Sequence, residues 1–286
     1  MNIAVLSDIH GNHVAFESCL EFLEKKEIDA FILLGDYVGE FPHTEITMDL
    51  IYELKKRYPC YIIRGNKEEY QLGGLGNDNL NWNEYPSTIG MIRYAARHTR
   101  EKDLAFFASL PITMRVELPD MPPLRICHGS PRKVKEDIRP GCEINKEMFA
   151  EIEEKYILSG HTHRVTNMEE HGKIVWNPGS VGVALDGSSK AQFMILHGVA
   201  GKWEPDFFAV AYDTDKVIQE MKDENLYELA PCWTKVSESL LKGGSVSHGH
   251  VLFRAMELCY EEIGRCNWPE VPEKYWQQAC REMLGE

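Results

Sequence analysis

Apolar runs that suit buried strands alternate with helix-like stretches over the first 65 residues. Strands are predicted at 2–7, 30–35 and 60–65, because each run is short, rich in apolar residues and followed by polar residues or glycine. Between them, 14–26 and 44–57 carry apolar residues at the three- and four-residue spacing of a helix. Strands that alternate with helices in this order predict an α/β fold, with a parallel sheet covered by helices.

The pattern changes after the third predicted strand. A long polar stretch at 72–87 is predicted to be a loop that leaves the sheet directly after Asn66, and a helical stretch follows to about residue 108. From residue 123 onward, short apolar runs separated by turns predict a second sheet that is mixed or antiparallel. These runs are 123–130, 155–163, 173–180, 191–197 and 206–212.

The last quarter of the chain has a different character, with short amphipathic helices predicted at 215–226, 235–244 and 249–264. In the last of these, four apolar residues are predicted to share one buried face, namely Leu252, Met256, Cys259 and Ile263. The expected organisation is a main domain over 1–212 and a helical extension over 213–286, which packs on that domain or on a partner subunit.

Composition narrows the class of function. The 286 residues carry a formal net charge of −14, from 45 acidic residues against 31 Lys and Arg. That balance argues against a general nucleic-acid surface, which needs a clustered basic face, but not against a small phosphate ester bound through metal ions. No apolar run reaches the roughly 18 residues of a membrane span, and the chain starts without a basic leader, so a cytoplasmic protein is expected. The eight cysteines are scattered and form no CxxC pair.

Polar side chains with metal-binding chemistry follow the predicted strands, at the point where each strand ends. The seven residues are Asp8, His10, Asp36, Asn66, His128, His161 and His163. Turn chemistry alone would favour Asn, Ser and Gly, without this excess of histidine. Two carboxylates, one carboxamide and four imidazoles suit a first-row divalent metal such as Mn, Fe or Zn better than Ca. Seven candidate ligands are more than one metal ion can bind while keeping positions open for substrate. Two metal ions bridged by a carboxylate are therefore predicted.

Five short motifs occur in order along residues 8–163, namely DIH, GD, GN, HG and GHTH. This ordered set resembles the calcineurin-like metallophosphoesterase superfamily, and the NPGSVG stretch at 177–182 is similar to its smaller bacterial phosphodiesterase-type members. The resemblance implies an αββα sandwich of two sheets flanked by helices, in agreement with the pattern of strands and helices.

The resemblance also implies a role for each of the seven residues. One metal ion would be held by Asp8, His10, Asp36 and His163, and the other by Asp36, Asn66, His128 and His161, with Asp36 as the bridge. The implied cofactors are two divalent ions, with Mn as the first choice and Fe, Zn, Ni or Co as alternatives. The implied reaction is hydrolysis of a phosphate ester by a water or hydroxide that bridges the ions and attacks phosphorus in line.

Lys67 departs from the family pattern. Many phosphatases of this superfamily have a histidine directly after the asparagine, where it is thought to help protonate the leaving group. Three roles stay open for Lys67: a phosphate contact, a solvated loop residue, or a general acid with a lowered pKa.

Asn12 is a candidate hydrogen-bond donor to the phosphate, or else a helix cap. His13 is a candidate substitute acid, against the simpler role of a polar residue at a helix start.

The loop at 72–87 is either a surface excursion or an overhang that selects the substrate, with Trp82 or Tyr85 stacking on a ring of that substrate.

The expected function is a two-metal phosphodiesterase that acts on a small phosphate ester. A phosphomonoesterase or nucleotide-polyphosphate hydrolase is the alternative, and a catalytically weak binding or scaffold protein on the same fold is the alternative of another class. No membrane partner is expected, and residues 213–286 are a candidate contact for a homo-oligomer.

Overall fold

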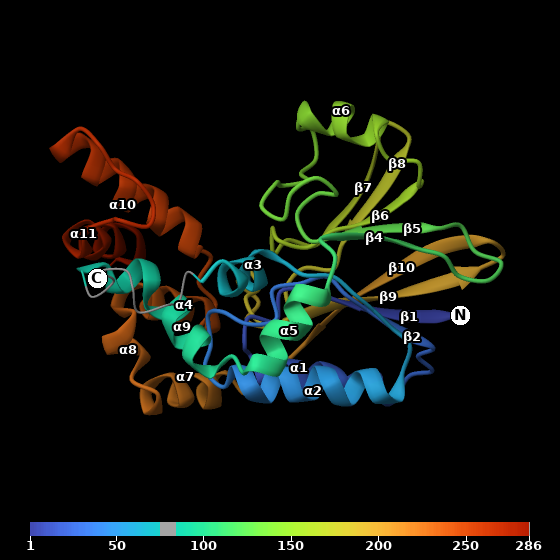
Figure 1. Cartoon of the computed structure of the whole chain (residues 1–286), viewed down its shortest axis with the longest axis horizontal. Coiled ribbons are helices and arrows are strands. Elements are labelled where there is room, and N and C mark those ends of the chain that lie inside the picture. The colour runs from blue at the N-terminus through green and yellow to red at the C-terminus, as the bar shows by residue number, and fades with distance from the viewer. Residues whose placement is uncertain (75–83, 286) are drawn as a thin grey trace.

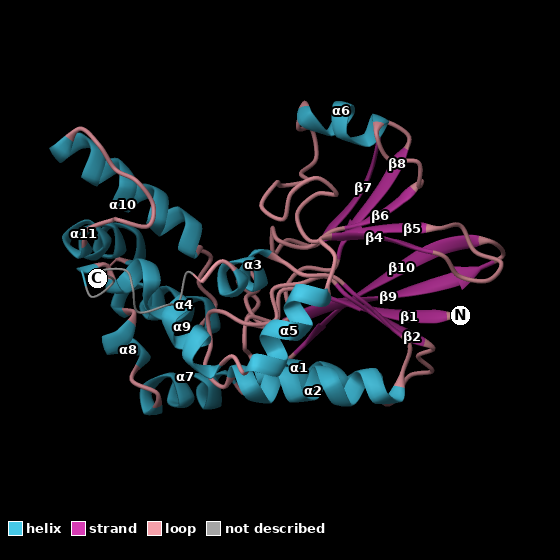
Figure 2. Cartoon of the chain, in the orientation of Figure 1, coloured by secondary structure: helices cyan, strands magenta, loops and turns pink. Residues whose placement is uncertain are grey.

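Two five-stranded sheets form the body of the protein, in a computed structural model that describes residues 1–74 and 84–285 (Figures 1 and 2). The first sheet has the strand order β10-β9-β1-β2-β3. Its strands are β1 (Asn2–Leu6), β2 (Ala30–Leu33), β3 (Cys60–Ile62), β9 (Ala191–Val199) and β10 (Lys202–Val210). β1, β2 and β3 run parallel, as the alternation of strands and helices predicts, whereas β9 runs antiparallel to β1.

The second sheet has the order β4-β5-β6-β8-β7 and mixes both strand directions, as predicted. Its strands are β4 (Thr113–Val116), β5 (Leu124–Cys127), β6 (Tyr156–Leu158), β7 (Thr166–Glu170) and β8 (Lys173–Asn177). The prediction is wrong for the runs at 191–197 and 206–212, because these form β9 and β10 and belong to the first sheet.

The side chains of β9 explain why its sheet could not be predicted from the local pattern. Phe193 and Ile195 pack with the helices outside the first sheet, whereas Met194 and Leu196 lie between the two sheets. An apolar run that is buried on both faces indicates a central strand but does not specify its neighbour. Pairing with β1, almost 190 residues earlier in the chain, decides which sheet it joins.

Helices cover the outer face of each sheet, so the layers run helix, sheet, sheet, helix (Figure 1). α1 (His13–Leu23), α2 (Thr44–Arg57) and α5 (Glu101–Ser109) share one apolar cluster with the first sheet. α6 (Ile144–Ala150) packs on the second sheet through Phe149. A further apolar cluster fills the space between the sheets. The predicted αββα sandwich is confirmed.

A short helix, α3 (Asn66–Leu72), begins at Asn66 itself. The prediction that a loop leaves the sheet directly after Asn66 is therefore wrong. Glu68 explains the helix start, because its carboxylate accepts the backbone N–H of Gly65, the residue before the helix, at 2.8 Å. α4 (Pro86–His98) follows with Tyr85 at its N-cap. Most of the predicted loop at 72–87, including Trp82, lies outside the described residues.

Helices make up the C-terminal part of the chain, as predicted. They are α7 (Thr214–Asp223), α8 (Leu226–Leu229), α9 (Pro231–Leu241), α10 (His248–Ile263) and α11 (Glu273–Leu284). They pack with α4 around an apolar cluster that also takes Phe41 and Val183 from the sandwich. Figure 1 shows this helical group, α4 and α7–α11, at the end of the sandwich opposite the N-terminus, beyond the carboxyl ends of β1 and β2.

The chain changes character near the predicted boundary, since β10 ends at Val210 and α7 begins at Thr214. Division into domains at residue 212 and contact with a partner subunit stay predictions. None of the described helices is both long and apolar enough to cross a bilayer.

The buried face of α10 only partly matches the predicted one. Val251, Ala255 and Leu258 are buried together with Cys259, which was the one residue of the predicted face that is fully enclosed. Ile263, in contrast, is 50% exposed. The face is turned because α10 packs chiefly on α11, a neighbour that the sequence pattern of a single helix does not reveal.

Replacement of Trp276 by alanine tests how firmly the helical group is held. The side chain of Trp276 is fully buried, and its Nε1 donates to Thr88 Oγ1 of α4 at 2.7 Å. Loss of a buried tryptophan leaves a cavity, so the free energy of unfolding should fall by about 3–5 kcal/mol in chemical denaturation. Phe253→Ala is the matched control, because that aromatic side chain on α10 is 69% exposed and should cost less than about 1 kcal/mol. Equal losses in the two variants would contradict this packing.

Candidate metal centre

Loops at the carboxyl ends of four strands bring the predicted ligands together. The ligands are Asp8 and His10 after β1, Asp36 after β2, His128 after β5, and His161 and His163 after β6, with Asn66 at the start of α3. Backbone hydrogen bonds join the loops to one another. Asp8 N–H donates to Gly35 O at 3.1 Å, and Gly160 N–H donates to His128 O at 2.7 Å. The two sheets therefore contribute to a single site.

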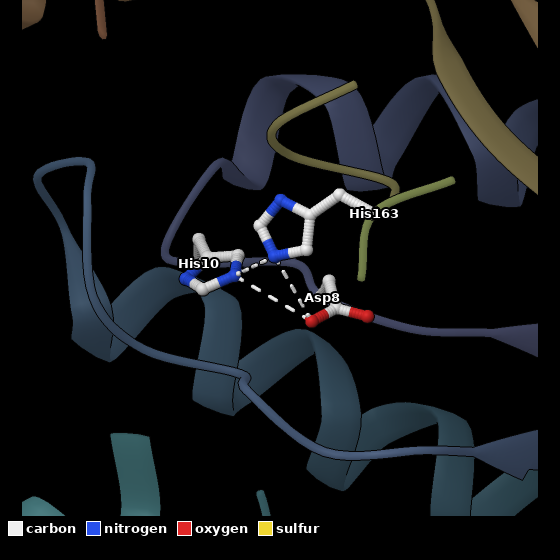
Figure 3. Close-up of side chains that lie close together, drawn as sticks. All are labelled: Asp8, His10 and His163. Carbon is white, nitrogen blue, oxygen red and sulfur yellow. Dashed lines mark hydrogen bonds and ion pairs between the residues drawn. The ribbon is translucent and has the colours of Figure 1, made fainter. Parts of the chain in front are cut away.

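Asp8, His10 and His163 form the first cluster of side chains (Figure 3). His10 Nε2 and His163 Nε2 lie 3.0 Å apart. Asp8 Oδ1 is 3.2 Å from His163 Nε2 and 3.7 Å from His10 Nε2. Figure 3 shows these three atoms pointing toward one position, with Nδ1 of His10 on the far side of its ring.

Asp8, Asp36 and His128 form the second cluster, so Asp8 belongs to both. His128 Nε2 is 3.4 Å from Asp36 Oδ1 and 3.9 Å from Asp8 Oδ1, and Asn66 Oδ1 lies 3.2 Å from the same nitrogen. Asp36 Oδ2 is 3.7 Å from His10 Nε2. The two oxygens of Asp36 thus face different clusters. The bridging role of Asp36 stays a prediction, and this geometry supports it.

His161 lies at the edge of the second cluster. Its ring centroid is 5.2 Å from that of His128, and its Nε2 is 3.5 Å from Asp137 Oδ1. Its backbone N–H donates to Asp8 Oδ2 at 3.1 Å. The imidazole of His161 is next to the other ligands but is not within either cluster, so its role as a ligand stays a prediction.

The outer contacts of the histidine rings determine which nitrogens carry protons. Nδ1 lies 2.9 Å from a backbone carbonyl oxygen in His163 and 2.7 Å from one in His128. A carbonyl oxygen can only accept, so in the neutral rings Nδ1 carries the proton and Nε2 presents a lone pair. In His10 the carboxylate of Glu40 contacts Nδ1, with the same result. Lone pairs therefore point inward from all three rings.

A divalent cation would satisfy this arrangement of acceptors. Asp8 Oδ2 accepts from Ser7 Oγ at 2.5 Å and from the backbone of His161, whereas Asp8 Oδ1 is buried and has no hydrogen-bond donor within the described part of the chain. Acceptors that converge in a buried place without donors are unfavourable unless a cation lies between them. The mixture of oxygen and nitrogen atoms suits a first-row divalent metal. The residues present therefore fit the predicted metal site.

The charges of the metal-free site favour a cation as well. Burial lowers the pKa of His10, but the carboxylates of Glu40 and Asp8 outweigh it and raise that pKa to about 10. Burial also lowers the pKa of His128, which Asp36 and Asp8 raise to about 9. Burial raises the pKa of Asp8, yet the neighbouring imidazoles hold it well below its usual value. The carboxylate of Asp8 thus stays ionised, and protons occupy the rings of His10 and His128 when no metal does.

Five of the seven predicted ligands have a left-handed backbone, with φ between 53° and 64°. They are Asp8, His10, Asp36, His161 and His163. This conformation costs a residue with a side chain roughly 1–2 kcal/mol, so the surrounding structure must hold it in place. Backbone strain of this kind gathers at functional sites.

The sequence profile of the calcineurin-like phosphoesterase superfamily domain matches residues 1–201. The chain belongs to this family. Over 244 residues the chain is 28% identical to the uncharacterized protein MJ0912 of Methanocaldococcus jannaschii, and the alignment covers 79% of this chain and 94% of that protein.

Two solved structures share the fold of this chain. The metallophosphoesterase from Sphaerobacter thermophilus has a TM-score of 0.67 at 23% identity, over 85% of this chain and 99% of that one. The hypothetical protein PH1004 from Pyrococcus horikoshii OT3 has a TM-score of 0.70 at 20% identity, over 86% of this chain and 99% of that one. At these identities the likeness concerns the fold.

Glu68 holds two loops that carry predicted ligands together, although the sequence motifs suggested no role for it. Its fully buried carboxylate accepts the backbone N–H groups of Asp36, Tyr37 and Gly65 at 2.9, 2.8 and 2.8 Å. Position 65 requires glycine, since a Cβ there would lie 2.3 Å from Asp36 Oδ1. Only the fold shows this contact, because a Glu in a polar stretch has the same local signal as a surface residue.

The NPGSVG stretch brings backbone against the first ligand loop, as its glycines predict. Val181 N–H and Gly182 N–H donate to the carbonyl oxygens of Ser7 and Asp8, each at 3.0 Å. Ser180 Oγ also donates to the carbonyl of Asp8, at 2.8 Å. The stretch therefore supports Asp8 rather than presenting a catalytic side chain.

Asn12 caps α1, which was one of its two predicted roles. Its Oδ1 accepts the N–H of Ala15 at 3.1 Å, and its Nδ2 donates to Gly182 O at 3.1 Å and to the hydroxyl of Tyr212 at 3.4 Å. Both ends of the amide are engaged within the chain. A contact from Asn12 to a substrate phosphate has no support in this geometry and stays a prediction.

His13 is paired with acidic residues away from the two clusters. Its Nε2 is 3.1 Å from Glu220 Oε2 of α7, and its Nδ1 is 3.5 Å from Glu17 Oε1. These contacts fit the simpler role of a polar residue at the start of α1. The role of substitute acid stays a prediction without a supporting contact.

Lys67 donates from Nζ to Glu40 Oε1 at 2.5 Å, and its side chain is only 13% exposed. The role of a solvated loop residue is therefore wrong. Burial lowers the pKa of Lys67, but the carboxylates of Glu40 and Asp36 raise it by more, so it lies above its usual value. A general acid would need the opposite shift, and this role loses its support.

Metal binding to this protein should strengthen as the pH rises. In the metal-free protein the pKa values of His10 and His128 are raised to about 10 and about 9, so a metal ion must displace a proton from each ring at neutral pH. Below these pKa values the apparent affinity should rise by up to about tenfold per pH unit for each proton released. Calorimetric titration with Mn²⁺ in buffers of different ionisation enthalpy counts the protons. An affinity that falls with rising pH would contradict the assignment.

Glu68→Ala should destabilise the protein strongly. The change leaves three buried backbone N–H groups without their acceptor, so the free energy of unfolding should fall by about 2–5 kcal/mol. Chemical denaturation of the metal-free protein measures it. Glu69→Ala on the same helix is the matched control, because that side chain is 39% exposed and has one ion pair, with Arg64, whose loss should cost about 1 kcal/mol or less. Similar losses for both would show that Glu68 does not hold the loops.

Proposed function

We propose that this chain is a metal-dependent phosphodiesterase that acts on a small phosphate ester. The observation that carries the proposal is the convergence of buried carboxylate oxygens and of imidazole Nε2 atoms around Asp8, in a chain of the calcineurin-like phosphoesterase family. The two clusters share Asp8 and suit two divalent ions, with Mn as the first choice.

The chain's own residues would hold the ions as the family resemblance implies. One ion would lie among Asp8, His10, Asp36 and His163, and the other among Asp36, Asn66, His128 and His161. Bound there, they would supply a water of lowered pKa and neutralise phosphate oxygens. The protein contributes rigidity, because the carbonyl contacts at Nδ1 fix the rings of His128 and His163 with Nε2 turned inward.

The charges around the clusters support a diester rather than a monoester. Three buried carboxylates whose pKa is lowered stand there, those of Asp8, Asp36 and Glu40. A diester carries one negative charge whereas a monoester carries up to two, so carboxylates repel the diester less. The ammonium of Lys67 is engaged by Glu40 and is not a leaving-group acid, so esters with good leaving groups should react fastest.

An aryl phosphodiester compared with the matching monoester, in the presence of Mn²⁺, tests the proposal. We expect metal-dependent turnover with a higher kcat/KM for the diester. Asp36→Asn should reduce kcat/KM by about 100-fold or more, since the change removes a carboxylate whose two oxygens face both clusters. Asp49→Asn is the matched control, because it makes the same chemical change at a side chain that is 55% exposed on α2.

The other results point to the alternatives. A higher kcat/KM for the monoester would favour a phosphomonoesterase. Metal binding without turnover of either compound in Mn, Fe, Zn, Ni or Co would favour a binding protein on the same fold. Turnover that survives Asp36→Asn would contradict the assignment of the site.

A further inference from the structure

The carboxylate of Glu40 contacts two other functional side chains at once. Its Oε2 contacts Nδ1 of His10, and its Oε1 accepts from Lys67 Nζ at 2.5 Å. The Glu40 side chain is 5% exposed and that of Lys67 is 13% exposed, so the three groups form a connected chain shielded from water. His10 Nδ1 is the nitrogen that points away from His163 and Asp8 (Figure 3). Glu40 therefore holds the outer side of a predicted metal ligand.

Gly39 leaves the room that this contact needs. A Cβ at position 39 would lie 2.9 Å from Nδ1 of His10 and 3.4 Å from Cδ of Lys67. The φ of Gly39 is 148°, which also favours glycine. The backbone before Glu40 is thus placed so that the imidazole and the lysine side chain can approach the same carboxylate.

α9 closes the other side of Lys67. Nζ lies 5.4 Å from the ring centroid of Trp233 and 5.9 Å from that of Tyr70, within the range of cation–π contacts. Trp233 is in turn stacked on His248, the first residue of α10, with ring centroids 4.4 Å apart. The cavity beside Lys67 has a volume of about 80 Å³. Pockets for ordinary small ligands are roughly 300–1,000 Å³, so this one leaves little space for a substrate to reach the ammonium.

We propose that Glu40 is a positioning residue of the metal centre and that Lys67 acts through it. The carboxylate of Glu40 fixes the orientation of the His10 imidazole, so that Nε2 faces the metal position. Lys67 supplies the counter-charge that makes a buried carboxylate tolerable. Lys67 thus serves His10 and does not touch the substrate. The inference rests on the proposed function only in requiring a divalent metal at this site.

Two accounts of Lys67 make opposite predictions for metal affinity. If Lys67 acted only as a positive charge near the site, Lys67→Met would tighten the binding of a cation. If Lys67 keeps Glu40 in place, the same change weakens binding, because an unpaired buried carboxylate is unfavourable and leaves its position against His10. A direct contact with substrate would leave metal affinity unchanged and alter only turnover.

Direct measurement of Mn²⁺ binding, by electron paramagnetic resonance and calorimetry, separates these accounts. After correction for the protons that the metal displaces, Glu40→Gln should weaken binding by about 10- to 100-fold, the range for partners of metal-bound histidines. Lys67→Met should also weaken it, and Lys67→Arg should restore it. The double variant Glu40→Gln/Lys67→Met should bind no more weakly than Glu40→Gln alone, because the two residues act as one unit. If an unpaired buried charge prevents a single variant from folding, the Mn²⁺ affinity of the double variant, which has neither charge, is compared with that of the wild-type protein instead.

Two controls exclude a general structural effect. Glu220→Gln changes another glutamate–histidine pair, in which the 17% exposed side chain of Glu220 places Oε2 3.1 Å from His13 Nε2, and it should leave Mn²⁺ affinity unchanged. Nitrogen NMR of the Zn²⁺-loaded protein reports the His10 ring directly, and its Nδ1 signal should move in Glu40→Gln while that of His128 does not. Thermal unfolding of the metal-free variants confirms that they are folded.

Any of three results would overturn the role of Glu40. Glu40→Gln could bind Mn²⁺ with wild-type affinity, or Lys67→Met could bind it more tightly. The third is a double variant whose loss of affinity equals the product of the losses in the two single variants. Failure of the wild-type protein to bind Mn²⁺, Zn²⁺ or Co²⁺ has a different meaning. It would overturn the proposed function itself, and the positioning role with it.

Discussion

Buried carboxylates and imidazole rings that converge on one position constrain the structure at this end of the molecule. Nε2 atoms of His10 and His163 lie 3.0 Å apart beside an oxygen of Asp8 that no donor reaches within the described residues. Such a group stays together because each member is held from its outer side, by backbone carbonyls, by Glu40 and by the N–H groups of the ligand loops. The left-handed backbone at five predicted ligands is a further cost of the same convergence. The surrounding structure thus holds the side chains of Asp8, His10 and His163 in an arrangement that a bound cation would stabilise.

Much of this arrangement could be predicted from the chain alone, because apolar runs mark the strands and parallel strands end at one edge. Asp8 and Asp36 follow such runs directly, and both lie in the clusters. The helix predicted at 44–57 has those bounds in the structure, since its apolar spacing and its basic last turn are local signals. The family pattern added the assignment of ligands to two ions, which spacing by itself left open.

Other parts depend on contacts between distant segments, which local patterns do not carry. β9 looks the same whichever sheet it joins, and only its pairing with β1 decides the matter. Glu40 follows a predicted strand and Glu68 lies in a polar stretch, positions that are ordinarily exposed, yet both are buried against residues about 30 positions away. Asn12 fitted two roles equally well by sequence, and the fold shows the capping contact. The supporting residues of the site were therefore harder to predict than its ligands.

The contact between Trp233 and Lys67 has a consequence for how such sites diverge. The family profile ends at residue 201, whereas Trp233 lies on α9, well beyond it. Two proteins can therefore share every ligand of this centre and still differ in what surrounds the lysine, because the C-terminal helices supply that wall. A change there would alter the surroundings of Lys67 and Glu40, and through them the support of His10, without replacing a predicted ligand. The C-terminal helices are thus a part of the chain in which relatives with the same predicted ligands can differ.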